Sequence, residues 1–188
     1  VRIEGDAAKT EKIRSFFRDR FLAVLGDGGN RGDVVESVLD LWPDPLGSFY
    51  KARLRVEALS ALLGETDFLQ SCKVVERTMN ILKGNREALP HAVDAGLFTE
   101  DLERRVFKSY QDSSAPIREA AGAGDFRRAT GLYAGAFFDI LNEFFEKVFV
   151  NAEDGNVRKN RLALLREVRD LYTIHIADIS KVRTSWPS

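Results

Sequence analysis

Apolar residues recur along this chain at the three- and four-residue intervals that are typical of α-helices. The clearest stripe lies in residues 66–82 and consists of Phe68, Cys72, Val75, Met79 and Leu82. Another lies in residues 8–25 and consists of Ile13, Phe16, Phe17, Phe21 and Val24. The sequence shows no alternating strand pattern of useful length and no internal repeat. The pattern therefore predicts an all-α fold.

Turn and cap signals divide the pattern into about six to eight helices, which we expect to pack as a helical bundle. The glycine-rich residues 26–30 end the first helix, and Asp33 is a candidate N-cap for a short helix that ends near Leu41. Thr66 and Asp125 are candidate N-caps further along the chain. The later helices are predicted over about 47–63, 66–82, 99–121, 125–138 and 157–179.

The composition fits one folded domain, because 44% of the 188 residues are apolar and 30% are charged. The formal net charge is only −1, so no overall basic field indicates a nucleic-acid partner. A polyanion would have to be held by local basic stripes. A single cysteine, Cys72, excludes an internal disulfide and favours a reducing compartment, and no signal peptide or apolar run of membrane-spanning length is recognisable.

Residues that could carry catalysis are sparse. The two histidines, His91 and His175, lie far apart in the sequence, and no metal-binding or phosphate-loop motif is recognisable. Residues 26–29 are glycine-rich, but the strand that precedes a phosphate loop is missing. Cys72 lies on an apolar stripe and is expected in the core. We expect the chain to be non-catalytic by itself, with no metal and no cofactor of its own.

Lys73, Arg77 and Asn80 follow one another at intervals of four and three residues, so they form a polar line opposite the apolar stripe of their helix. Lysine and arginine can hold phosphates, while an arginine fork and an asparagine amide can bind base edges. The same line is also typical of a solvated helix face. The sequence leaves both interpretations open.

Two arginines stand where a helix should be apolar. Arg20 falls on the stripe of the first helix, and Arg161 shares a face with Leu165, Val168 and Tyr172. A buried charge is costly unless it is paired, which favours an ion pair with a carboxylate such as Asp19, Asp33 or Asp178. The alternative is an arginine that packing holds rigidly, with its head presented to RNA.

Arg158, Lys159 and Arg161, with Arg166 further on, form the densest basic cluster of the chain. Cations at a helix N-terminus oppose its dipole, which suggests another partner, either a phosphate backbone or the neighbouring Glu153 and Asp154.

Three aromatic residues flank the turn between Pro43 and Pro45, namely Trp42, Phe49 and Tyr50. They could stack an unpaired base or fasten the loop to the core.

Several short motifs occur in a fixed order near the end of the chain. Residues 144–152 read FFEKVFVNA, residues 158–165 read RKNRLALL, and residues 177–180 read ADIS. Upstream, residues 16–20 read FFRDR, 32–39 GDVVESVL, 55–59 RVEAL and 77–82 RTMNIL. In these motifs the chain resembles the C-terminal part of the bacterial glycyl-tRNA synthetase beta subunit. It departs from that family at Glu76, where lysine is usual, and at Ser37, where alanine is common.

The resemblance implies a helical anticodon-binding domain over residues 8–181, of the type known from class Ia synthetases, with a linker at 1–7 and a tail at 182–188. It implies glycine tRNA as partner and, through the full-length beta subunit, the catalytic alpha subunit in the cytoplasm, with ATP used only by the parent enzyme. Two alternatives remain: the corresponding domain of arginyl-tRNA synthetase, and a helical protein-interaction module without an RNA role. The candidate tRNA contacts are Lys73, Arg77, Asn80, Arg158, Lys159, Arg161 and Arg20.

Overall fold

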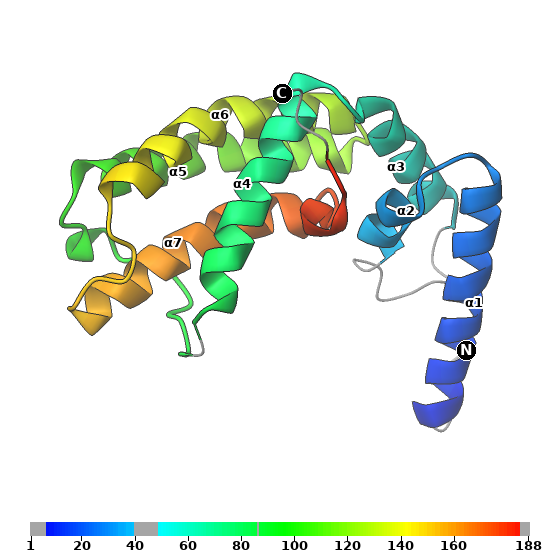
Figure 1. Cartoon of the computed structure of the whole chain (residues 1–188), viewed down its shortest axis with the longest axis horizontal. Coiled ribbons are helices and arrows are strands. Elements are labelled where there is room, and N and C mark those ends of the chain that lie inside the picture. Colours follow the sequence, from blue (N-terminus) through cyan, green and yellow to red (C-terminus); the bar gives the residue numbers. More distant parts are fainter. Residues whose placement is uncertain (1–6, 40–48, 86, 185–188) are drawn as a thin grey trace.

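The computed structural model of the chain describes residues 7–39, 49–85 and 87–184. Over these residues the chain forms seven α-helices and two short 3-10 helices, without a strand, which confirms the predicted all-α fold (Figure 1). The α-helices are α1 (Ala7–Asp27), α2 (Gly32–Leu39), α3 (Phe49–Leu62), α4 (Thr66–Lys83), α5 (Asp101–Gly122), α6 (Phe126–Lys147) and α7 (Gly155–Thr173). The 3-10 helices are η1 (Ala95–Leu97) and η2 (Ile179–Lys181).

Helices α4 to α7 form a bundle in which α5 and α6 run side by side, while α4 and α7 pack against them (Figure 1). Its centre is a group of buried rings. Tyr133 lies 4.9 Å from Tyr172 and 5.0 Å from Phe137, measured between ring centroids. The buried hydroxyls are satisfied, because Tyr133 donates to the Val168 carbonyl and Tyr172 shares a hydrogen bond with Thr130. The apolar stripe of α4 faces this core, with Cys72 buried as predicted.

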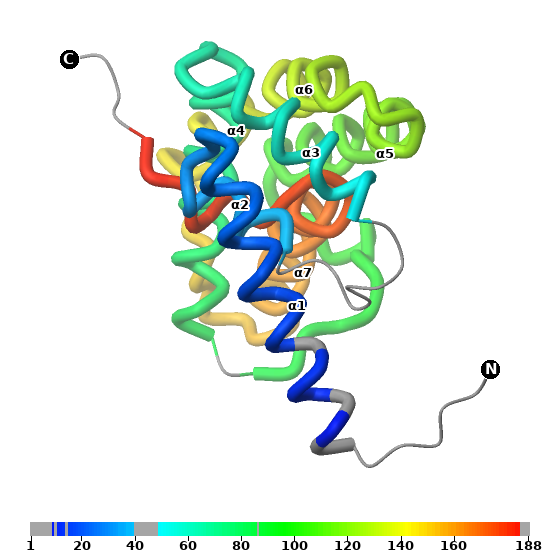
Figure 2. The backbone as a smooth tube through the Cα atoms, turned by 90° about the vertical axis from the view of Figure 1, so that its right-hand side faces the viewer, coloured from blue at the N-terminus to red at the C-terminus, as the bar shows by residue number. Residues whose placement is uncertain are grey.

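Helices α1 to α3 form a smaller layer at one end of the bundle, and α1 extends away from it (Figures 1 and 2). Helix α1 packs mainly on α2 and α3, where the Phe21 and Phe49 rings are 4.6 Å apart. The apolar stripe of α1 is therefore only partly covered, since Ile13, Phe16 and Val24 are 50%, 62% and 55% exposed. Arg20 is exposed as well, so it is not a buried charge that needs a partner.

Most predicted helix boundaries hold within a few residues, and Asp125 caps α6 by accepting from the Arg128 backbone N–H. The N-cap of α4 is Glu65 instead of Thr66. Helix α6 runs on to Lys147, and the last long helix ends at Thr173 instead of near residue 179. It ends because the backbone N–H groups of Ile176 and Ala177 both donate to the Tyr172 carbonyl, which turns the chain toward α2.

The C-terminal segment stays packed after this turn. The Asp178 backbone N–H donates to the Ser37 carbonyl at 2.9 Å, and Val182 is buried. The Arg183 N–H donates to the Asp33 carboxylate at 2.9 Å. The packed structure thus continues past the predicted domain end at residue 181. None of the described helices is both long and apolar enough to cross a membrane.

The burial of Cys72 predicts a slow reaction with thiol reagents. Burial, and to a lesser degree the nearby Glu76 carboxylate, raises the pKa of the Cys72 thiol to about 12, so little thiolate forms at pH 8. We expect labelling of the folded chain to be at least roughly tenfold slower than that of the chain in denaturant. An Asp112→Cys variant, with a thiol on an exposed site of α5, should add one fast-reacting group. Equally fast reaction of Cys72 in the folded chain would contradict its placement in the core.

Candidate nucleic-acid interface

A buried ion pair joins the start of α5 to the middle of α7. Arg161 is 5% exposed and Glu103 is fully buried, and the Arg161 Nε lies 3.0 Å from the Glu103 Oε1. Arg161 also donates to the Thr99 hydroxyl at 2.8 Å and, through Nη1, to the Phe149 carbonyl at 2.7 Å. The guanidinium therefore ties α7 to α5 and also to the turn that follows α6.

Glu103 performs a second task at the N-terminus of α5. Its Oε2 accepts hydrogen bonds from the backbone N–H groups of Thr99 and Glu100, in a reciprocal capping arrangement. Burial by itself would raise the pKa of the Glu103 carboxyl, but the hydrogen bonds from Arg161 and these two N–H groups outweigh it and hold the pKa below its usual value. The carboxylate is thus ionised and fully satisfied at neutral pH.

The structure has the buried ion pair that the sequence favours for Arg161, but the predicted partners are wrong. Asp33 pairs with Arg31, and Asp178 accepts from the backbone and hydroxyl of Ser180. The signal for the correct partner was present in Thr99–Glu103, where a glutamate three residues after the helix cap indicates a carboxylate held at the helix start.

The predicted polar line on α4 is divided between two environments. Arg77 is half-buried: its Nη1 donates to the Asn142 side-chain oxygen at 2.7 Å, and its guanidinium lies 4.6 Å from the centroid of the Phe145 ring. Lys73 is also half-buried, whereas Asn80 is exposed. The interpretation as a solvated helix face is therefore wrong for Arg77, because α6 packs beside it.

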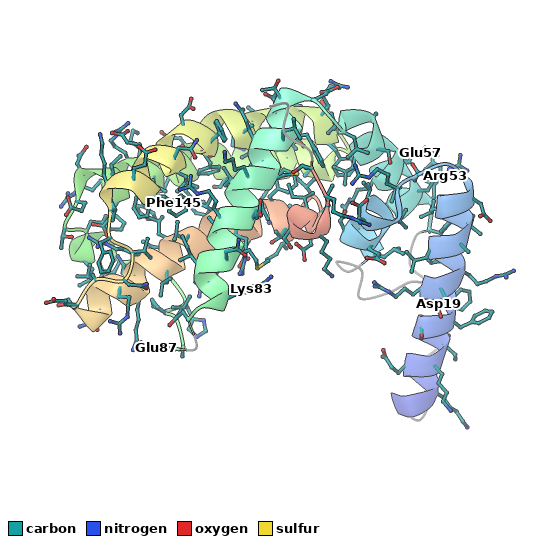
Figure 3. All side chains as sticks on the ribbon, in the orientation of Figure 1. Asp19, Arg53, Glu57, Lys83, Glu87 and Phe145 are labelled. Atoms are coloured by element: carbon teal, nitrogen blue, oxygen red, sulfur yellow. The ribbon has the colours of Figure 1, made fainter. Side chains whose placement is uncertain are left out.

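Beyond Arg77 the surface is hollowed by a groove of about 580 Å³. One side is the end of α4, and the other is Phe145 of α6 together with the turn after α6 (Figure 3). The groove combines aliphatic and aromatic walls with a guanidinium and two side-chain amides. It is lined by Arg77, Asn80, Ile81, Gly84, Phe145, Val148, Phe149, Val150 and Asn151.

The basic cluster at the start of α7 adjoins this turn. Arg158 donates to the Ala152 carbonyl at 3.1 Å, and both Arg158 and Lys159 pair with Glu87, at 3.0 and 3.3 Å. These contacts hold the pKa of the Glu87 carboxyl below its usual value. The partner is thus Glu87 instead of the predicted Glu153 or Asp154, since Asp154 caps α7 by accepting from the Asn156 and Val157 N–H groups.

The remaining predicted residues lie apart from the groove. Arg20 is on α1, at the opposite end of the molecule from the start of α7 (Figure 1). Tyr50 is 69% exposed on α3, while Phe49 packs on Phe21. Trp42 falls within 40–48, outside the described residues. Among the described residues, no group of three or more histidine, cysteine or acidic side chains could hold a metal ion.

The sequence of this bundle matches a known domain family. Residues 72–174 match the DALR anticodon binding domain family, and this stretch makes up more than half of the chain and coincides closely with the α4–α7 bundle. The chain belongs to the DALR anticodon-binding domain family. The groove, the buried ion pair, Arg158 and Lys159 all lie within the matched stretch.

The chain is also similar to curated proteins of the kind that the sequence motifs indicated. The chain is 32% identical over 184 residues to the glycine–tRNA ligase beta subunit of Myxococcus xanthus, covering 95% of this chain and 25% of that protein. It is 34% identical over 170 residues to the same subunit of Geotalea daltonii, covering 90% of this chain and 23% of that protein. The resemblance to this subunit is confirmed, and the chain spans about a quarter of the length of these relatives.

The ion pair predicts a pH-dependent loss of stability. Glu103→Gln should lower the free energy of unfolding at pH 7 by about 3–5 kcal/mol, because it leaves Arg161 buried without its carboxylate. The folded pKa of Glu103 is lowered, so its contribution is complete above the unfolded pKa of about 4.3 and is lost as pH falls through the folded value. Urea unfolding should therefore show a difference between parent and variant that shrinks from pH 7 toward pH 3.

Asp112→Asn is the matched control, because it breaks an exposed ion pair with Lys108 on the same helix, and it should stay close to the parent at each pH. A Glu103→Gln deficit that is the same at both ends of the pH range would contradict the ionised pair.

Proposed function

We propose that this chain is the anticodon-binding domain of a glycine–tRNA ligase beta subunit, and that it binds the anticodon loop of glycine tRNA. The observation that carries the proposal is the coincidence of the family match with the bundle, since residues 72–174 contain both the groove and the basic cluster beside it. The relatives are glycine–tRNA ligase subunits, which favours glycine tRNA over the arginyl alternative.

Binding would combine two kinds of contact, one to the phosphates and one to the bases. Arg158 and Lys159 offer positive charge at the start of α7, where a phosphate could replace the Glu87 carboxylate that now lies between them. The groove offers flat apolar walls and amides, which suit the faces and edges of unpaired bases. Phosphate contacts would fix the position of the loop, and base contacts would supply the selection of one anticodon.

The wider setting follows from the same proposal. The full beta subunit would act with an alpha subunit in the cytoplasm, and that enzyme would join glycine to its tRNA with ATP. This chain would contribute recognition only, so the isolated chain should show no aminoacylation and should need neither ATP nor a metal to bind RNA.

The proposal predicts selective but weak binding of glycine tRNA by the isolated chain. Its affinity should exceed that for the same tRNA with altered anticodon bases, by about five- to hundredfold if one base contact is lost. The affinities should be compared by titration at one stated salt concentration, because phosphate contacts weaken as salt rises. Equal affinity for the two tRNAs at moderate salt would contradict a role in anticodon recognition.

The phosphate contact predicts that Glu87→Gln strengthens tRNA binding, because Arg158 and Lys159 no longer have to leave a carboxylate in order to meet a phosphate. The gain should reach up to about fivefold, the equivalent of one surface ion pair. Glu65→Gln is the matched control, since it releases Arg127 from an exposed ion pair at the other end of α6. Equal gains in both variants would remove Arg158 and Lys159 from the proposed contact.

A further inference from the structure

Phe149 is held in an unusual position at the edge of the groove. Its side chain is 72% exposed, although Val148 before it is buried and Val150 after it is half-buried. The backbone on either side is fixed, because the Phe149 carbonyl accepts from Arg161 at 2.7 Å and the Val148 N–H donates to the Phe144 carbonyl at 2.8 Å. The turn therefore presents an aromatic face to solvent without the freedom of a loop.

The α4 side of the groove is also preorganised. The Arg77 guanidinium lies over the Phe145 ring and is oriented by the Asn142 side chain, so it brings a positive charge to the groove. Ile81 adds an aliphatic wall from the end of α4.

Two amides complete the rim. Asn80 and Asn151 are exposed, and neither side-chain amide forms a hydrogen bond within the described part of the chain. Each amide can donate and accept, so together they can pair with a polar edge whose groups lie in one plane.

We propose that this groove binds one unpaired nucleobase of the anticodon loop, stacked on the Phe149 ring with its polar edge toward Asn80 and Asn151. This inference rests on the proposed function and adds to it the residues that would select the base. A nucleobase has a flat π face and a rim of donors and acceptors, which is the combination that the groove offers.

The groove's volume and charge support the same occupant. A volume of about 580 Å³ lies within the range of small-ligand sites and is ample for a base with part of its sugar. A purely apolar peptide side chain would use the walls but would offer no acceptor to the remaining N–H groups of Arg77 and no partner to either amide, which is unfavourable when water is displaced. A nucleotide would satisfy all three.

The test uses an RNA hairpin with the anticodon stem and loop of glycine tRNA. Phe149→Leu keeps an apolar side chain but removes the π face, so it should weaken binding by roughly five- to hundredfold, the usual contribution of one stacked base. Phe149→Tyr keeps the ring and should bind within about twofold of the parent. Neither change should alter the slope of affinity against salt, because no phosphate contact is removed.

Two controls separate this site from other exposed rings. Phe16→Leu removes a ring of similar exposure on α1, far from the groove, and should bind like the parent. Tyr50→Leu removes the exposed ring of α3, which is the competing stacking site. Loss of binding in Tyr50→Leu with none in Phe149→Leu would overturn the proposal and move the base to α3.

Hairpins with an abasic nucleotide at each of the three anticodon positions in turn identify the base. If the missing base is the one that stacks on Phe149, the abasic hairpin should bind the parent and Phe149→Leu equally. The loss of binding free energy from removing the base and the loss from Phe149→Leu should then not add. At the other positions the losses should add. Additive losses at all three positions would overturn the contact.

Failure of this inference can be told from failure of the proposed function. If the parent prefers the glycine anticodon and folded Phe149→Leu binds equally well, the groove is not the base site and the proposed function still stands. If the parent does not distinguish anticodons, the proposed function fails first. Asn80→Ala, on the exposed face of α4, gives a second variant that should relax discrimination among bases while leaving thermal unfolding unchanged.

Discussion

The ion pair between Arg161 and Glu103 is the contact on which both the bundle and its candidate RNA-binding surface depend. One guanidinium binds the carboxylate that caps α5, the Thr99 hydroxyl before that helix, and the Phe149 carbonyl after α6. A buried charge is costly unless all its hydrogen-bonding partners are in place, because losing any partner leaves it unsatisfied in a low-dielectric interior. The pair therefore gives three separate segments a single relative placement, which an apolar contact of the same size would specify less strictly.

As a result, arginines with a structural role and basic residues that could bind RNA lie close together on the same helices. Arg161 points into the bundle and fixes a backbone, while Arg158 and Lys159, three and two residues earlier, reach the surface and share Glu87. Arg77 likewise packs against α6 on one side and lines the groove on the other. Side chains that structure holds rigidly can offer their remaining donors to a ligand at low entropic cost, which is the physical advantage of building the site on helix ends.

Periodicity alone predicted the helices well, because the stripe of α4 and the cap at Asp125 are local features of the sequence. It failed where tertiary contacts decide. The apolar residues of α1 recur at helical spacing, yet within the described part of the chain only some of them are covered. Helix α7 ends early because Ile176 and Ala177 both donate to the Tyr172 carbonyl, and the chain then reaches Ser37 through the Asp178 N–H. The basic residues were found, but their acidic partners, Glu103 and Glu87, lie 58 and 71 residues from Arg161 and Arg158. Phe149 was missed because only the fold reveals which residue of the VFVN turn faces outward.

Mapping where the anticodon contacts the chain tests the groove as the base-binding site most directly. A glycine tRNA anticodon hairpin with a photoreactive base in the anticodon can be cross-linked to the protein, and the attached residues identified by mass spectrometry. If the groove holds an anticodon base, cross-links should form in the turn at 148–151 and at the end of α4, around Asn80 and Ile81. Cross-links confined to α1 and α3, with none in these two segments, would contradict it.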